Sequence, residues 1–320
     1  MAEALQPHSR AASWSRYWQG GHKDTCFLAG QAFSIREHWM SLFSSLPDNS
    51  RIVDLATGNG AVALLAAEAA RDNGKSFDIT GVDFARIQPD RVADNDPDLV
   101  SRVNFIADTP VENLPLADAS QDVVVSQFGF EYSRTADTIN EISRVLVPGG
   151  RVRMLIHATD GAVSKASQGR LKRARDICAR GQLVDLARAL QPASTADYAG
   201  ARKDDKNLAR FRSRLSTARK KYAAAPDDDV VHYVISYLTE LVDRRLRVDP
   251  NDYRQAVANL QAEIKAYSLR LNAMTNAARS KKDMDTLVSQ LQDSALVEGS
   301  FALLEDERGA IGWFLKAHRA

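Results

Sequence analysis

The sequence predicts an α/β protein with a doubly wound parallel sheet, a large all-helical insertion and a C-terminal antiparallel hairpin. Across residues 49–159, short β-branched runs alternate with alanine-rich helical runs, an order typical of parallel strands joined by crossover helices. Residues 160–294 show helical periodicity and almost no strand signal. Residues 295–320 hold two β-rich runs around the turn-like segment Asp306-Glu307-Arg308-Gly309, which indicates a hairpin.

The predicted core strands are short and apolar. They cover residues 52–55, 77–82, 103–107, 122–126 and 152–156. The fourth, Asp122-Val123-Val124-Val125-Ser126, has the continuous apolar character of a strand buried on both faces. Predicted helices over residues 61–70 and 136–146 separate these strands, and the second ends at Pro148-Gly149-Gly150.

Residues 1–48 are expected to form a helical cover over this core, behind a loose tail of about twelve residues. Trp14, Tyr17 and Trp18 stand at positions i, i+3 and i+4, so they share one face of a predicted helix, with Ser13 as its cap. A second helix is predicted from Ser34 to Leu46.

The insertion contains an apolar stripe in which the steps alternate between four and three residues. Its members are Tyr253, Val257, Leu260, Ile264, Tyr267, Leu271, Met274 and Ala278, behind a capping box at Asp252 and Gln255. This spacing is typical of the seam between two packed helices. It leaves two interpretations open, packing within a helical bundle or pairing of two copies as a homodimer.

Charge is distributed unevenly although the net charge is only +1. Residues 161–226 contain sixteen basic and five acidic side chains, so the rest of the chain is acidic. Such a segment suits a negatively charged small substrate, an RNA or an anionic lipid surface, and it is equally typical of a solvated helical face. Nucleic acid is disfavoured because no aromatic ladder or known RNA module accompanies the charge.

Composition and cysteine usage are those of a cytoplasmic globular protein. Hydrophobic residues make up 44% and charged residues 26% of the chain. No run approaches the about 18 apolar residues of a membrane span, and the first residues lack the order of a signal peptide. The two cysteines, Cys26 and Cys178, lie far apart and outside any CxxC pattern, which disfavours disulfides and zinc. We expect no metal site.

The motif with most chemical content is Val53-Asp54-Leu55-Ala56-Thr57-Gly58-Asn59-Gly60, between a predicted strand and a predicted helix. Gly58 and Gly60 permit a sharp turn and the close approach of a ligand, and the amides at the helix start suit a polar group. Asp54 would repel a pyrophosphate, and the spacing is neither GxGxxG nor GxxxxGK[ST]. We therefore expect a nucleoside ligand that also carries an ammonium or sulfonium cation.

Two more acids end predicted strands. Asp83 lies 23 residues after Gly60, where a carboxylate can accept both hydroxyls of a ribose. Asp108 follows the third strand and could accept from an exocyclic amine. A single strand-terminal aspartate is more often a cap or turn residue, and it is the occurrence of all three acids in order that favours a ligand site.

Four segments resemble the class I S-adenosylmethionine-dependent methyltransferases, closest to the subgroup with the ubiquinone/menaquinone-type enzymes. They are the glycine motif above, Gly81-Val82-Asp83-Phe84-Ala85, Glu112-Asn113-Leu114-Pro115-Leu116 with Asp122-Val123-Val124, and Glu141-Ile142-Ser143-Arg144-Val145-Leu146-Val147-Pro148-Gly149-Gly150. The resemblance covers residues 50–158 and 296–320. It implies a Rossmann-like sheet of seven strands, S-adenosylmethionine as cofactor and S-adenosylhomocysteine as product.

The resemblance also implies roles for individual residues. Asp54, Ala56, Thr57, Gly58 and Gly60 would hold the methionine end, Asp83 the ribose, and Phe84, Asp108 and Thr109 the adenine, whereas Ser126, Gln127 and Phe128 would line the methyl-transfer site. Ala56 departs from the pattern, since glycine is commoner there. Aromatic rings can contact a sulfonium, and the candidates are Tyr17, Trp18, Phe128, Phe130 and Tyr132.

Methyl transfer from a sulfonium needs approach geometry and exclusion of water more than activation. A hydroxyl or carbon-acid acceptor also needs a base, and the candidates are His157, Glu131 and His22, each with an alternative role as a hydrogen-bonding or surface residue. The sequence Ser126-Gln127-Phe128-Gly129 stands where amine methyltransferases carry Asn-Pro-Pro-Tyr, which disfavours exocyclic amines.

The sequence therefore predicts a methyltransferase for a small or medium-sized acceptor, which could be anionic, with the insertion as substrate lid. An RNA or polyanion methyltransferase that uses the basic insertion is one alternative. A non-catalytic cofactor-binding subunit, held to a partner through the Tyr253–Ala278 stripe, is another.

Overall fold

The computed structural model describes residues 7–22, 32–191, 205–307 and 309–320. Two compact units share them: Met1–Ala166 with Ala273–Ala320, and Ser167–Asn272. The sheet lies in the first unit, and the second is helical. Cys26 and Arg308 lie outside the described residues, and so do Asp197, Arg202, Lys203 and Asp204 of the basic segment 161–226.

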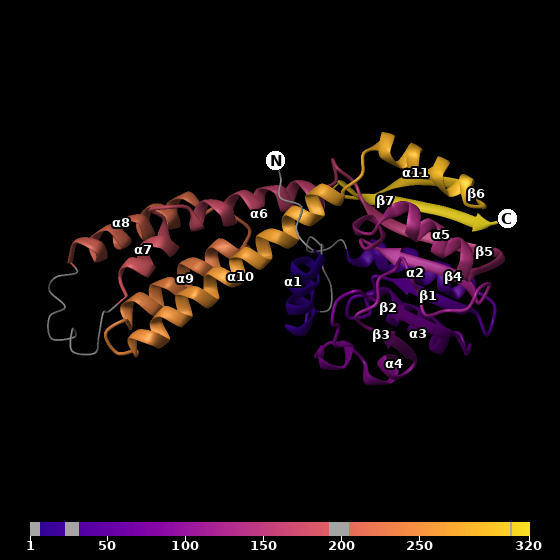
Figure 1. Ribbon diagram of the computed structural model, residues 1–320, viewed down its shortest axis with the longest axis horizontal. Helices are drawn as coiled ribbons and strands as arrows, with labels where there is room; N and C mark the ends of the chain where they lie inside the picture. Colours follow the sequence, from indigo (N-terminus) through magenta and orange to yellow (C-terminus); the bar gives the residue numbers. More distant parts are fainter. Residues whose placement is uncertain (1–6, 23–31, 192–204, 308) are drawn as a thin grey trace. The chain divides into compact units, whose positions relative to one another are not determined.

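The first unit contains a seven-stranded sheet in the order β3-β2-β1-β4-β5-β7-β6 (Figure 1). The strands are β1 (Arg51–Leu55), β2 (Asp78–Val82), β3 (Val103–Ile106), β4 (Gln121–Gln127), β5 (Leu146–His157), β6 (Leu296–Asp306) and β7 (Gly309–Arg319). Strands β1 to β5 pair in parallel, whereas β7 is antiparallel to both β5 and β6. The predicted fold, including the C-terminal hairpin, is confirmed.

Strand β1 lies between β2 and β4, so the chain order reverses direction at β1 and β4. Ligands of such sheets bind outside the carboxyl ends of the strands at this switch point. Apart from His22, the polar residues expected to bind a ligand lie at or just after the carboxyl ends of β1, β2, β3, β4 or β5.

Helices cover both faces of the sheet. Val123 and Val125 of β4 pack in the same cluster as α2 (Ala32–Ser44), α3 (Ala61–Asp72) and α4 (Pro97–Ser101). Val124 packs in a second cluster with α5 (Thr135–Val145) and α11 (Lys281–Asp293). Because successive strand residues point to opposite faces, the continuous apolar run of β4 fits a strand buried on both sides.

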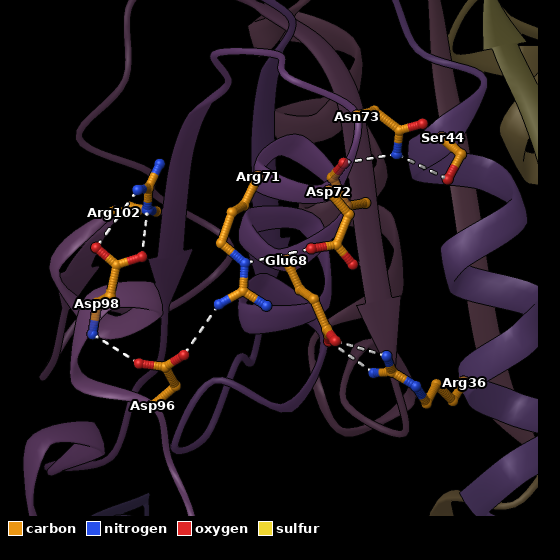
Figure 2. A network of polar contacts seen from close by, with 10 residues as sticks. Arg36, Ser44, Glu68, Arg71, Asp72, Asn73, Asp96, Asp98 and Arg102 are labelled. Atoms are coloured by element: carbon orange, nitrogen blue, oxygen red, sulfur yellow. Dashed lines mark hydrogen bonds and ion pairs between the residues drawn. The ribbon is translucent and has the colours of Figure 1, made fainter.

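A network of ion pairs on the outer side of α3 connects it to α2 and α4. Figure 2 shows Glu68 receiving two hydrogen bonds of 2.7 Å from Arg36 of α2. Arg71 reaches Asp96, the N-cap residue of α4, at 3.0 Å. Partly exposed pairs of this kind contribute up to about 1 kcal/mol each, so the network adds only modestly to the stability of this unit.

The N-terminal helix α1 (Pro7–Gln19) begins earlier than its sequence indicated. The prediction of Ser13 as its cap was wrong, because Ser13 is a buried residue inside the helix. The shared face of Trp14 and Trp18 packs against Ala85, with Tyr17, Phe84, Ile87 and Tyr132 around it.

The second unit is built from parts of α6 (Ala162–Cys178) and α10 (Pro250–Ala277), with α7 (Leu183–Ala189), α8 (Asp205–Lys221) and α9 (Val230–Asp243). The first four residues of the apolar stripe, Tyr253 to Ile264, are buried in its core. The hydroxyl of Tyr253 donates to the carbonyl oxygen of Ala187 at 2.8 Å. This half of the stripe is therefore core packing within the unit. Asp249, rather than Asp252, accepts a backbone hydrogen bond at the start of α10, from Asn251 at 2.8 Å.

The compact helical unit is shorter than the insertion expected from the sequence, residues 160–294. Met284, Leu287 and Leu291 of α11 belong to the core beneath the sheet, and Ser280 and Asp283 form a capping box at its start. Among the described residues, no helix combines the length and apolar character of a membrane span. The remaining short helices are η1 (Pro89–Arg91) and η2 (Phe130–Tyr132).

Candidate active site

The loop from Ala56 to Gly60 connects β1 to α3 and turns through three left-handed residues. The φ angles are 54° at Ala56, 56° at Gly58 and 94° at Gly60. Glycine adopts this region freely, whereas alanine pays about 1–2 kcal/mol. Ala56 is the position where the resemblance expects glycine, and its backbone conformation explains that preference.

Asp54 supports the loop from beneath. The carboxylate is almost fully buried and accepts hydrogen bonds from the Thr57 hydroxyl at 2.7 Å and from the Ala63 amide at 3.2 Å. Burial raises the pKa of Asp54 to about 7, against the two hydrogen bonds, which lower it. The side chain thus connects the end of β1 to the loop and to the first turn of α3.

Asp83 connects the glycine loop to the segment after β2. One carboxylate oxygen accepts from the Gly58 amide and the other from the Ala85 amide, both at 2.8 Å. The residue is 2% exposed, and burial raises the pKa of Asp83 to about 6. Since a carboxylate has about four acceptor positions, these two bonds leave it capacity for further donors.

Trp18 lies over the glycine loop. A Cβ built on Gly58 would come within 2.5 Å of its Cη2 and Cζ2 atoms. The Asn59 side chain fastens this arrangement, because its amide nitrogen donates to the carbonyl oxygens of Trp18 at 3.0 Å and His22 at 2.7 Å. Asn59 was absent from the sequence-based candidates. The sequence signal that could have indicated it is the position of Asn59 between Gly58 and Gly60, since its side-chain amide can both donate and accept hydrogen bonds.

The residues expected near an adenine lie at the ends of β2 and β3. Phe84 is half-buried in the aromatic cluster with Trp14 and Trp18. The Thr109 amide donates to the Asp83 carbonyl oxygen at 2.9 Å, which brings these two segments together. Asp108 is exposed, with a φ angle of 52°, and pairs with Arg86 at 3.2 Å.

The segment after β4 is held by its own side chains. The Ser126 hydroxyl donates to the Leu55 carbonyl oxygen at 2.9 Å and accepts from the Phe130 amide at 3.1 Å. The side-chain oxygen Oε1 of Gln127 accepts from the Trp39 indole at 2.6 Å. Both side chains therefore bind protein groups in this structure.

Phe128, Glu131 and His157 lie together at the carboxyl ends of β4 and β5. The ring centroids of Phe128 and His157 are 4.1 Å apart, and Phe128 has a left-handed backbone with φ of 53°. His157 Nδ1 is 2.6 Å from Glu131 Oε1, and both side chains are fully buried. The third candidate base, His22, is exposed and stacks on Tyr17 with ring centroids 4.2 Å apart.

These features are compatible with a ligand that combines a nucleoside with a positively charged group. The Trp18 indole occupies the space directly over Gly58 in this structure, and the two buried acids beside the loop, which have raised pKa values, would gain from a nearby positive charge. No group of three or more His, Cys, Asp or Glu side chains in the described part of the chain is arranged to bind a metal ion.

Comparisons with known proteins also indicate a methyltransferase domain. Residues 52–150 match the family model described as a methyltransferase domain. A ubiquinone/menaquinone biosynthesis C-methyltransferase from Geotalea daltonii is 37% identical over 116 residues, 35% of this chain and 47% of that protein. A malonyl-[acyl-carrier protein] O-methyltransferase from Geobacter sulfurreducens is 36% identical over 110 residues, 34% of this chain and 39% of that protein.

The matched segment thus spans about half the length of these curated relatives, or less. Among solved structures, geranyl diphosphate C-methyltransferase from Streptomyces coelicolor is 16% identical, with a TM-score of 0.36, covering 48% of this chain and 66% of that one. This structural similarity is too weak to indicate a function. The family match, the curated relatives and the seven-stranded sheet together identify residues 52–150 as the core of a class I S-adenosylmethionine-dependent methyltransferase domain.

Proposed function

We propose that this protein transfers a methyl group from S-adenosylmethionine to an acceptor of small or medium size. The observation that carries the proposal is the pair of buried carboxylates, Asp54 and Asp83, which flank the glycine loop at the switch point of the sheet. Buried acids are costly unless they are compensated, and a donor with a sulfonium and an ammonium group supplies compensating charge.

The residues present suggest how the donor is held. Asp54 and the loop of Ala56, Thr57, Gly58 and Gly60 would bind the methionine end, and Asp83 would accept from the ribose hydroxyls. Phe84, Asp108 and Thr109 would contact the adenine, with Trp18 over the loop. When bound, S-adenosylmethionine supplies a methyl carbon that is already activated by its sulfonium, so the protein's task is to align the acceptor and exclude water.

The acceptor is the finer part of the proposal. The two curated relatives are named for a quinone-type carbon and a malonyl oxygen, so their shared segment does not define one acceptor. Substrate selection is expected from the parts outside that segment, in particular the N-terminal helix and the helical insertion. An anionic acceptor suits the basic charge of residues 161–226.

Calorimetry with S-adenosylmethionine and S-adenosylhomocysteine tests the donor site. Wild type should bind both, and Asp83→Ala should lose at least tenfold in affinity. Asp83→Asn, which keeps an acceptor but removes the charge, should fall between them. Asp98→Ala is the matched control, because Asp98 is exposed and pairs with Arg102. Absence of binding to wild type would refute the proposal, and unchanged binding to Asp83→Ala would refute the ribose assignment.

A polyanionic acceptor such as RNA is the second candidate, and α8 favours it. Seven basic side chains of this helix are exposed: Lys206, Arg210, Arg212, Arg214, Arg219, Lys220 and Lys221. Binding to single-stranded RNA should then weaken steeply as salt is added, in proportion to the phosphates contacted. A flat salt dependence, or no RNA binding, would leave the small-molecule acceptor.

A further inference from the structure

His157 and Glu131 form a fully buried pair at the ends of two neighbouring strands. His157 is the last residue of β5, and Glu131 lies in η2, just after β4. Strands β4 and β5 are parallel neighbours, so both residues lie at the carboxyl edge of the sheet. The donor loop follows β1, which pairs with β4 on its other side. The pair is therefore one strand removed from the donor loop, at the same edge.

The geometry of the pair selects one tautomer of the imidazole. Glu131 Oε1 is 2.8 Å from the His157 backbone nitrogen and 2.6 Å from Nδ1. The backbone N–H can only donate, and an ionised carboxylate can only accept, so Nδ1 carries a hydrogen as well. In the neutral ring the lone pair then resides on Nε2, the nitrogen that can take up a proton.

Glu131 is poorly satisfied for a purely structural residue. Its second oxygen, Oε2, is buried and has no hydrogen-bond partner among the described residues. Leaving a buried acceptor without a partner costs about 1–3 kcal/mol, and most buried polar groups in folded proteins avoid it. A carboxylate hydrogen-bonded to the Nδ1 of a histidine is the arrangement that orients the base in serine-protease-type catalytic triads.

The surroundings of His157 are mainly aromatic. The Phe128 ring lies tilted against the imidazole, with centroids 4.1 Å apart, and Tyr132 meets it edge-on at 6.1 Å. The ionisable neighbours seen in contact include Glu131, Tyr132 and Arg279. The Arg279 amide donates to the His157 carbonyl oxygen at 2.7 Å, while its guanidinium reaches the Thr135 hydroxyl at 3.2 Å. A water-poor site of this kind strengthens the interaction between the imidazole and a developing charge.

We propose that His157 is the general base of the methyl transfer, that Glu131 positions it, and that the acceptor is a phenol or enol whose hydroxyl must lose its proton. This inference rests on the proposed function. The acceptor's O–H bond breaks, its proton bonds to Nε2, and the electron pair stays on the acceptor. That pair attacks the methyl carbon, and the electrons of the carbon–sulfur bond pass to sulfur. The proton on the imidazolium later leaves to solvent.

This step defines the substrate class. A carboxylate acceptor is already ionised at neutral pH and gains nothing from a base. A phenolic or enolic hydroxyl is mostly protonated at that pH and becomes a strong nucleophile only when the proton is removed. The pair therefore favours a hydroxyl conjugated to a ring or carbonyl group, with the methyl group received by the oxygen that lost its proton.

A phenol that changes colour on ionisation tests the inference without turnover. The probe is 4-nitrophenol, whose phenolate absorbs visible light, added to the full chain saturated with S-adenosylhomocysteine. At a pH below the midpoint of the free probe, wild type should raise the phenolate fraction at least threefold. His157→Asn should abolish this rise, and Glu131→Gln should reduce it severalfold. The side-chain amide of Asn at position 157 can donate to Glu131 in place of the imidazole Nδ1–H. The matched control is His38→Asn, because His38 is a half-buried histidine that packs against Phe314.

Two further measurements keep the result interpretable. The ¹⁵N NMR signals of wild-type His157 should show a protonated Nδ1 and an unprotonated Nε2. A structural histidine in the opposite tautomer would give the reverse pattern. This measurement uses wild type alone, so it does not depend on whether His157→Asn folds. With S-adenosylmethionine, methylation of 4-nitrophenol should fall about 10²–10⁴-fold in His157→Asn.

The outcomes separate the two proposals. Failure of wild type to bind S-adenosylhomocysteine refutes the proposed function. Binding without a phenolate signal, or a signal that persists in folded His157→Asn, overturns the role of His157 and leaves the donor site in place. A protonated Nε2 with a bare Nδ1 overturns the positioning role of Glu131.

Discussion

The indole of Trp18 packs so closely on Gly58 that a Cβ at position 58 would lie 2.5 Å from two of its ring atoms. From this contact a series of rings leads across the carboxyl edge of the sheet. Trp18 stacks on Trp14, Trp14 meets Tyr132 edge-on at 5.8 Å, and Tyr132 meets His157 at 6.1 Å. Helix α1 therefore contacts both the glycine loop and Tyr132, whose ring meets that of His157.

Gly58→Ala should damage the donor site through this contact. The added Cβ must displace Trp18, and the φ angle of 56° adds strain. We expect a loss of about 2–3 kcal/mol in unfolding free energy and at least tenfold in S-adenosylhomocysteine affinity, measured by urea denaturation and calorimetry.

Gly74→Ala is the matched control for that substitution. Gly74 has a similar φ angle of 63°, but nothing lies within 4 Å of its added Cβ. It should lose only about 1–2 kcal/mol and keep the donor affinity of wild type. Equal donor affinities in the two variants would show that the contact between Trp18 and the loop does not matter for binding.

Gly129 and Ala56 should show coupled effects. A Cβ on Gly129 would lie 2.5 Å from the Ala56 Cβ, so Gly129→Ala should destabilise the protein by about 2–3 kcal/mol. Ala56→Gly relieves a left-handed alanine and should be close to neutral alone, because glycine also costs unfolded-state entropy. The double variant should recover at least about 1 kcal/mol in a denaturation cycle. Additive effects would contradict the contact.

Stability should fall as pH rises through the range set by Asp54. Its folded-state pKa of about 7 lies above the ordinary value of 3.8, so between these values the folded protein holds a proton that the unfolded chain has released. The resulting stabilisation is present at low pH and lost by pH 7. From pH 5 to pH 8, urea denaturation should show a loss of about 2–3 kcal/mol that is smaller in Asp54→Asn. The same profile in both proteins would assign the pH dependence elsewhere.

Asp229 should contribute far more to the free energy of unfolding than its neighbour Asp228. Asp229 is buried, caps α9 through the Val231 amide at 3.2 Å, and accepts from Arg173 at 2.5 and 2.8 Å. Removing it leaves a guanidinium without its partner, so Asp229→Ala should cost about 3–5 kcal/mol in urea denaturation followed by circular dichroism. The exposed Asp228 pairs with Arg170, and Asp228→Ala should cost below about 1 kcal/mol. Similar losses would rule out the burial argument.

Much of the first unit could be predicted because its signals are local. Each strand of the parallel sheet was predicted within a few residues of its bounds, since a buried parallel strand is a short apolar run whatever lies beside it. An exception is β5, which begins at Leu146 and includes Pro148-Gly149-Gly150, a segment predicted as a turn. Pairing with the start of β4, where Gln121 lies opposite Leu146, draws this segment into the sheet.

Element membership was harder to predict than element type. Helix α11 has a clear capping box and an apolar stripe, and nothing in that local pattern says whether it belongs to the insertion or to the sheet. Its place is decided by Met284 and Leu291, which bury against the residues beneath β4 and β5. Likewise, the start of α1 depends on packing of its aromatic face, because Ser13 taken alone resembles a cap.

The amino-acid sequence by itself determined the strands, the glycine loop and the acids that end β1 and β2, because each depends on residues within one turn or one strand. The tertiary structure alone decided which distant side chains meet. Trp18 reaches Gly58, and Glu131 reaches His157, only because strand order and helix packing bring those segments together, and no local periodicity encodes such long-range neighbours.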